Sequence, residues 1–224
     1  MIGVGIVTCG RPGFYAQVRA SLTIGFDELF VYEDGSPDFG YTGTGDGASH
    51  GVGAAKNILF RQMLDAGCDW LFVIEDDILV TSPRVFDEYI GACEESGYEH
   101  LSFHGHGPHN PTPLGANGRV TLWPNYVGAF CVYSRESLET CGLLDEGFHN
   151  AWEHVEHTLR LAQEGFTAPW RGAADATGSE RWLAEIPDAI EHSVIRRDPE
   201  WTQHMEEGKR HWKATHPDTY HLVF

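Results

Sequence analysis

The sequence predicts an α/β protein built on an open, mostly parallel sheet with helices on both faces. Two observations lead to this fold class. Short runs of β-branched and small residues alternate with segments whose apolar residues recur at helical spacing. One of these runs, residues 69–77, is apolar through most of its length, as expected for a parallel strand buried on both faces. With 224 residues, 42% of them hydrophobic, the chain is long enough to form a sizeable core.

The first strand is expected in residues 2–9, because small and β-branched residues fill this run. After a Gly-Arg-Pro-Gly turn at 10–13, apolar residues at helical spacing predict a helix over 14–22. The second strand is expected in residues 28–36 and ends in turn residues.

Residues 53–67 place apolar side chains on one helical stripe and end at Gly67, which is typical of a helix C-terminus. The third strand, 69–77, follows directly. A helix over 83–97 is then expected to cover it.

The second half begins with one more short strand and a Gly-, Pro- and His-rich loop within residues 100–120. A strand over 125–134 and a short helix over 135–142 are expected next. A longer helix is expected in 150–166, and an amphipathic helix within 198–217 that packs back on the body. We see no repeat and no linker, so we expect one domain over residues 1–224.

Charge and cysteine content restrict the class of protein. The net charge of -18 argues against a general binder of nucleic-acid phosphates, which would present a basic face. The five cysteines form no CxxC pair and are typical of free thiols in a reducing compartment. No signal peptide and no apolar run of about 20 residues is evident, so we expect a cytoplasmic protein without a membrane span.

Polar residues follow the first three predicted strands, at Thr8 to Arg11, Glu33 to Ser36 and Glu75 to Asp77. In open α/β sheets, ligands bind beyond the carboxyl ends of the strands, so these residues are expected to meet at one edge. The acids at 75–77 lie between apolar runs, and buried carboxylates need compensation.

Adjacent carboxylates at a strand end suit a hard divalent cation, which takes oxygen ligands and retains water or phosphate oxygens. A bound cation would compensate the acids. The alternatives are a solvated cluster of loop acids, or acids placed for the N-terminus of the following helix.

Five fragments occur in the order expected for a glycosyltransferase of the GT-A fold, and the ordered match spans about residues 3–168. The second half is similar to glycosyltransferase family 2, and the EDD strand end resembles the N-acetylglucosaminyltransferase I type. The fragments are IVTCGRP, VYEDGSPD, GAAKN, LFVIEDDILVTSP and VGAFCVYSRESLETCGLLDEGFHNAWEHVEHTLRLAQEGF.

The resemblance implies a Rossmann-like sheet with a nucleotide-sugar-binding half, residues 1–100, and an acceptor-side half with a helical tail, residues 101–224. It also implies Mn²⁺ or Mg²⁺ as cofactor and a nucleotide-diphospho-sugar donor, a UDP-sugar being favoured. Asp77 would be the metal ligand. The implied nucleotide-sugar-binding residues are Thr8, Arg11, Glu33, Asp34, Lys56, Asn57, Glu75 and Asp76.

A base for the acceptor hydroxyl is implied at the start of the 150–166 helix. In the family an acid pair follows a Gly/Trp-rich turn, and its second acid is the common base. Here the pair is Glu153-His154, so either residue is a candidate, and we favour Glu153 because a carboxylate keeps the family's charge. His192 follows a predicted strand and is a candidate second metal ligand.

The loop histidines His104, His106 and His109 are candidates for contact with the acceptor. The resemblance predicts a metal-dependent, inverting transfer of sugar to an acceptor hydroxyl. The acceptor stays open among a glycan, a small metabolite and a modified nucleobase.

Three other functions compete with this prediction. The His154 and His157 spacing does not match the motifs of zinc hydrolases. A nucleotidyltransferase of sugar phosphates would use a similar sheet, although TCGRPGFY is a poor version of its Gly-rich loop. A catalytically silent nucleotide-sugar-binding module is the third, because Glu153-His154 departs from the usual acid pair.

Overall fold

The computed structural model describes residues 1–35, 48–107 and 110–224. Its main sheet has five strands in the order β2-β1-β3-β8-β5. The β2-β1 and β1-β3 pairs are parallel, whereas β8 is antiparallel to both of its neighbours, so four of the five strands run the same way. The strands are β1 (Ile2–Thr8), β2 (Glu28–Glu33), β3 (Trp70–Glu75), β5 (His100–Ser102) and β8 (Phe130–Ser134).

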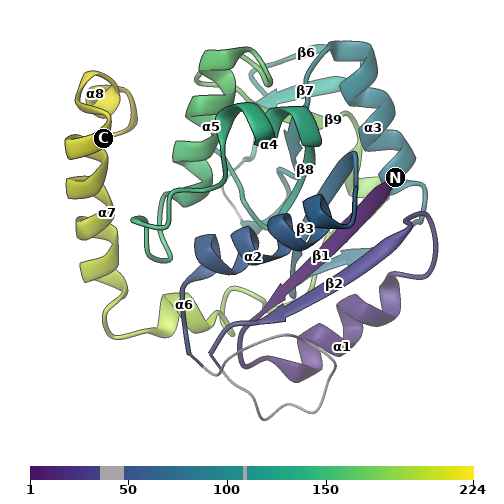
Figure 1. Ribbon diagram of the computed structural model, residues 1–224, viewed down its shortest axis with the longest axis horizontal. Coiled ribbons are helices and arrows are strands. Elements are labelled where there is room, and N and C mark those ends of the chain that lie inside the picture. The colour runs from purple at the N-terminus through teal and green to yellow at the C-terminus, as the bar shows by residue number, and fades with distance from the viewer. Residues whose placement is uncertain (36–47, 108–109) are drawn as a thin grey trace.

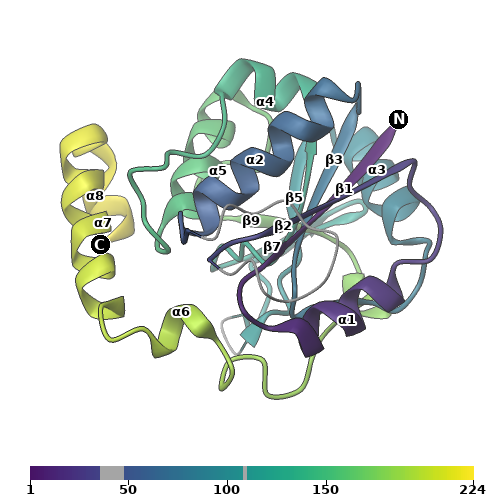
Figure 2. The ribbon, with the colours of Figure 1, turned by 60° about the horizontal axis from the view of Figure 1, so that its bottom comes forward.

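Helices cover both faces of this sheet, as predicted. One core combines α1 and α3 with one face of β1 and β3, and a second core combines α2, α4 and α5 with the other face. Figure 2 shows α2, α4 and α5 above the strands and α1 below them. The helices are α1 (Pro12–Ser21), α2 (Val52–Asp65), α3 (Val85–Ser96), α4 (Arg135–Cys141) and α5 (Glu153–Glu164).

The third predicted strand is divided at its acids. β3 ends at Glu75, a turn contains Asp76 and Asp77, and β4 (Ile78–Val80) continues in a separate two-stranded sheet with β10 (Leu183–Glu185). The Gly/Pro-rich segment expected to be a loop contains two short strands, β6 (Gly115–Asn117) and β7 (Val120–Trp123). They form a three-stranded sheet with β9 (Ala173–Ala176).

The C-terminal segment forms an arm at one side of the body (Figure 1). It comprises α6 (Val194–Arg197), α7 (Trp201–Thr215) and α8 (Tyr220–Val223). The expected amphipathic helix is α7, and its Trp212 is fully buried against Phe148 and Leu159 of the body. Two histidines also hold the arm, because His211 contacts Asp145 and His216 contacts Glu156.

No helix among the described residues combines the length and apolar character that crossing a bilayer requires.

Two buried histidines make the fold sensitive to acid. Burial lowers the pKa of His157 to about 3 and that of His100 to about 4. The unfolded chain takes up these protons near pH 6.5, whereas the folded chain takes them up only near pH 3 to 4. Between these values the unfolded state binds more protons, so the free energy of unfolding is highest above pH 6.5 and falls as pH falls toward 4. We expect the free energy of unfolding to fall by up to about 1.4 kcal/mol per pH unit for each histidine.

Urea unfolding at pH 7.5, 6.0 and 5.0 measures this slope. His157→Gln is expected to flatten it, because glutamine takes up no proton. An equal slope in wild type and variant would show that His157 does not contribute.

Candidate functional site

A cavity of about 740 Å³ opens at the carboxyl ends of β1 and β3. It lies where the strand-end rule places a ligand site. The parallel register pairs Val7 with Glu75, so the residues after these strands lie side by side. Eight of the predicted site residues line the cavity: Thr8, Arg11, Asp34, Glu75, Asp76, Asp77, Glu153 and His154.

Arg11 compensates two of the buried acids. Its guanidinium contacts both carboxylate oxygens of Asp76 and lies 3.2 Å from Oδ2 of Asp77. Thr8 donates a 2.7 Å hydrogen bond to Asp76. Burial raises the pKa of Asp76 to about 7, and Arg11 and Thr8 act against this shift by stabilising the ionised form.

Glu75 is compensated separately by a lysine from helix α2. The ammonium of Lys56 lies 2.7 Å from Oε1 of Glu75 and donates to the carbonyl of Gly128 at 2.8 Å. Although burial favours the neutral acid, Lys56 lowers the pKa of Glu75 to about 2. Lys56 was predicted to approach the nucleotide, but it is not among the residues that line the cavity.

Asp77 lines the cavity and has a buried oxygen without a partner among the described residues. The residue is 4% exposed, and its Oδ1 has no hydrogen-bond partner among the described residues. Burial and the neighbouring Glu75 raise the pKa of Asp77. Among the residues that the structure describes, no three His, Cys, Asp or Glu side chains gather into a metal site. A divalent cation at Oδ1 would supply the missing partner and favour the ionised carboxylate, and it would complete its shell with water and substrate phosphates.

Glu153 is the first residue of α5 and is held by an unusual backbone. Trp152 before it has φ = 73°, which is rare for an aromatic residue. Gly53 leaves room for Glu153, since a Cβ at Gly53 would lie 3.3 Å from the Glu153 side chain.

Only one of the two oxygens of the Glu153 carboxylate has a partner among the described residues. The residue is 3% exposed, its Oε1 lies 3.1 Å from Nδ1 of His154, and its Oε2 has no partner among the described residues. Burial opposes ionisation, but His154 and Lys56 together lower the pKa of Glu153. An ionised carboxylate with one free oxygen can accept a proton.

His106 also lines the cavity, on the side of the acids. Its Nδ1 lies 2.8 Å from Oε1 of Glu185, and the amide of Gly107 donates to Oε2 of Glu185. Strand β10 carries Glu185 to this position, because it pairs with Ile78 and the amide of Ile186 bonds the carbonyl of Asp77. The sequence marked His106 as one of three loop histidines but gave no sign of Glu185.

Three other predicted residues serve the scaffold. Asp34 lines the cavity, yet both of its carboxylate oxygens accept from the chain at His50 and Gly51. Glu33 accepts from the amide of Gly10 and does not line the cavity. The side chain of Asn57 bonds both backbone groups of Leu144 and likewise lies outside the cavity lining.

His192 is exposed in a turn and does not line the cavity. Its ring lies 5.8 Å from that of Phe14. Ser36 and His109 lie outside the described residues.

The cavity also has a group of aromatic and aliphatic lining residues, which sequence reasoning missed. Polar lining residues such as Arg171 and Arg196 lie close to them in the sequence. We call the aromatic and aliphatic group the aromatic wall: Tyr126, Trp152, Trp170, Trp201, Met205, Leu222 and Val223. The arm supplies the last four. Their apolar spacing predicted a packed helix but could not show that part of it faces a cavity.

No protein-family model and no curated protein sequence matches the chain. Solved structures do match, at low sequence identity. Residues 1–349 of TarS from S. aureus match with a TM-score of 0.57 and 13% identity, over 100% of this chain and 75% of that one.

Two further structures carry nucleotide sugars. The mannosyltransferase PcManGT from Pyrobaculum calidifontis, in complex with GDP-Man and Mn²⁺, matches with a TM-score of 0.58 and 14% identity, over 99% of this chain and 70% of that one. A mutant of the β1,4-galactosyltransferase 7 from Drosophila, in complex with manganese, UDP-Gal and xylobiose, matches with a TM-score of 0.53 and 14% identity, over 86% and 74%. The chain therefore has the GT-A fold that the sequence resemblance implied.

Proposed function

We propose that this protein is a metal-dependent glycosyltransferase that moves a sugar from a nucleotide-diphospho-sugar to an acceptor hydroxyl. The observation that carries the proposal is the arrangement of the cavity. Asp77, with an unpartnered oxygen, and Glu153, with another, line the same cavity in a GT-A fold. A silent binding module would have no need of the second, ionised carboxylate.

Each side chain has a role in the proposed reaction. Thr8 and Arg11 lie on the donor side and hold the acids in place. The acceptor oxygen forms a bond to the anomeric carbon, the bond from that carbon to the phosphate oxygen breaks, and its electron pair leaves with the nucleoside diphosphate. Glu153 Oε2 takes the hydroxyl proton, and a single base of this kind fits direct displacement with inversion.

Asp77 would hold the cation, Mn²⁺ or Mg²⁺. When bound, such a cation neutralises the charge that develops on a departing diphosphate. Manganese accompanies the donor in the mannosyltransferase and galactosyltransferase structures. The role of His192 as a second ligand stays a prediction, which a manganese titration of His192→Ala would test.

The proposal is tested by donor binding. Asp77→Asn keeps the size of the side chain but removes its charge. Loss of an outer-shell partner already costs about 10- to 100-fold in metal affinity, so Mn²⁺-dependent affinity for the donor is expected to fall at least that much when the ligand itself is changed. Calorimetric titration of UDP-Glc, UDP-Gal and GDP-Man, with Mn²⁺ or with EDTA, measures this change.

Asp87→Asn is the matched control, since Asp87 lies in the first turn of α3, away from the cavity lining. Metal-dependent donor binding that survives Asp77→Asn unchanged would refute the metal site. Donor binding without release of nucleoside diphosphate for any acceptor would favour the silent module. A nucleotidyltransferase would instead release pyrophosphate from a nucleoside triphosphate and a sugar phosphate.

A further inference from the structure

The aromatic wall adjoins the proposed base directly. Trp152 precedes Glu153 in the chain, and Val155 in the first turn of α5 also lines the cavity. A group that lies against this wall can therefore bring its hydroxyl to Glu153.

Polar groups of the wall are already engaged within the protein. The hydroxyl of Tyr126 accepts from the amide of Arg171 at 2.9 Å, and the indole N–H of Trp152 donates to the carbonyl of Met205 at 3.3 Å. Tyr126 and Trp170 stack on each other with one face each, and the remaining ring surface of the wall is available for contact. The wall is thus built to contact apolar faces, whereas a site that selects a polyol would offer hydrogen-bonding groups to its hydroxyls.

Three of the polar residues that line the cavity near the wall are engaged as well. Asn150 accepts from the amide of Val52, and Ser193 accepts from the amide of Arg196. Asp198 accepts from the amide of Glu200.

Trp170 differs from the other residues of the wall. Its Nε1 is buried and has no hydrogen-bond partner among the described residues. Its ring stacks on Tyr126, with centroids 4.8 Å apart and an interplanar angle of 15°. A buried donor without a partner is costly, so a ligand with an acceptor atom at this point would relieve it.

We propose that the acceptor is an aryl or heteroaryl alcohol, in which a flat ring carries the reacting hydroxyl on or one carbon from the ring and also carries a hydrogen-bond acceptor atom. The ring packs on the aromatic wall, its acceptor atom takes the Trp170 N–H, and its hydroxyl reaches Glu153. In the transfer, the hydroxyl oxygen bonds to the anomeric carbon and its proton passes to Glu153, as the nucleoside diphosphate leaves. This inference rests on the proposed function.

Binding is tested first, because it does not depend on turnover. Saturation-transfer NMR on the full chain compares 4-(hydroxymethyl)pyridine, benzyl alcohol, cyclohexylmethanol and glucose. The pyridine alcohol is expected to bind most tightly, followed by benzyl alcohol. Cyclohexylmethanol has nearly the same size but is not flat, and is expected to bind more weakly than either.

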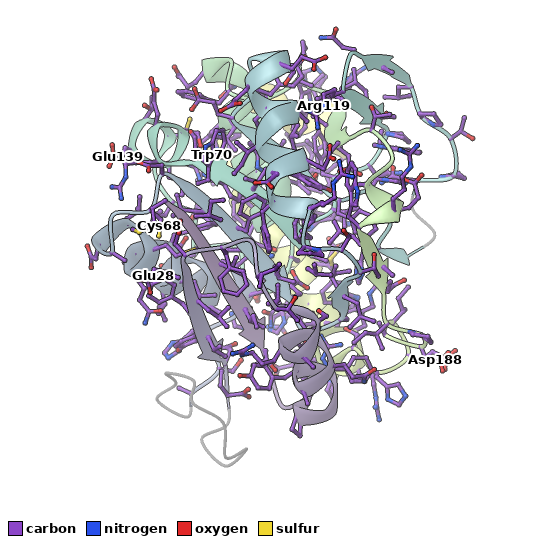
Figure 3. The ribbon with its side chains drawn as sticks, turned by 90° about the vertical axis from the view of Figure 1, so that its right-hand side faces the viewer. Glu28, Cys68, Trp70, Arg119, Glu139 and Asp188 are labelled. Carbon is purple, nitrogen blue, oxygen red and sulfur yellow. The ribbon has the colours of Figure 1, made fainter. Side chains whose placement is uncertain are left out.

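Trp170→Phe keeps an aromatic ring and removes the N–H. It is expected to raise the KM for 4-(hydroxymethyl)pyridine about three- to tenfold, to leave that for benzyl alcohol within about twofold, and to leave kcat unchanged. Trp70→Phe is the matched control and is expected to change neither. Figure 3 shows Trp70 at the opposite end of the molecule from Asp188, which is followed by the cavity residues Ala189 and Ile190.

Transfer is then followed as release of nucleoside diphosphate with the donor that binds. 5-Hydroxymethylcytidine, free and within an oligonucleotide, distinguishes a small acceptor from a ring carried on a polymer; transfer to either supports the inference. Preferred transfer to glucose, or equal binding of cyclohexylmethanol and benzyl alcohol, would overturn the inference and leave the proposed function standing. Ring alcohols that bind but receive sugar from no donor would overturn the proposed function and the acceptor role together.

Discussion

Glu153→Gln is expected to lower kcat for sugar transfer by about 10²- to 10⁴-fold, the usual contribution of a general base. Glutamine has nearly the same size but cannot take the proton of the acceptor hydroxyl. Donor affinity is expected to stay within about twofold, because the donor side of the cavity is built from the strand ends of β1 and β3. Nucleoside-diphosphate release measures the rate, and calorimetry measures the binding.

The pH profile separates Glu153 from His154. The pKa of Glu153 is lowered despite burial, chiefly by His154, so a Glu153 base stays ionised well below neutral pH. With Glu153 as base, kcat at saturating donor and Mn²⁺ is expected to show no loss of the base from pH 8 to about 5.5. A base that acts as a neutral imidazole would instead lose activity within this range. The ratio kcat/KM also reports donor binding beside Asp76, whose pKa burial raises to about 7.

Glu164→Gln is the control on the same helix, because Glu164 is exposed at the end of α5. A fully active Glu153→Gln enzyme with an inactive His154→Gln enzyme would move the base to His154. Full activity in both variants would refute a base at this position.

The sequence was enough to predict that the acids at the ends of the strands lie close together, because this follows from the order and direction of the strands alone. Parallel strands end at the same edge, so residues that follow β1 and β3 become neighbours whatever their side chains do. The partners of those acids follow no such rule. Arg11 was expected to face the nucleotide, but its guanidinium contacts Asp76 and Asp77, and that depends on side-chain placement across two strands.

Short strands were the elements that sequence reasoning missed. Strand β9 is Ala-Ala-Asp-Ala, which has little β-propensity, and β6 is three exposed residues beginning with glycine. These strands form through pairing with β7, and long-range pairing leaves no local pattern. The same limit applies to Glu185, whose place beside Asp77 follows from the β4-β10 pair.

Removal of Lys56, which compensates the charge of Glu75, is expected to have the largest effect on stability. Lys56 is 2% exposed, and its ammonium is held between Glu75 and the carbonyl of Gly128. Lys56→Met would leave the Glu75 carboxylate without its partner. Breaking a buried pair in this way costs about 3–5 kcal/mol, and we expect about 3 kcal/mol because a fifth of the Glu75 side chain is exposed.

Arg61→Met on the same helix is the matched control for this prediction. The Arg61–Glu146 pair is about half exposed at both ends, so its loss is expected to change the free energy of unfolding by less than about 1 kcal/mol. The double variant Lys56→Met/Glu75→Gln removes both charges and is expected to be more stable than Lys56→Met alone. Urea unfolding of wild type, Lys56→Met, Glu75→Gln and the double variant closes the cycle, and Arg61→Met is measured beside them. If Lys56→Met proved no more destabilising than Arg61→Met, Lys56 would not be what holds Glu75 ionised at the end of β3.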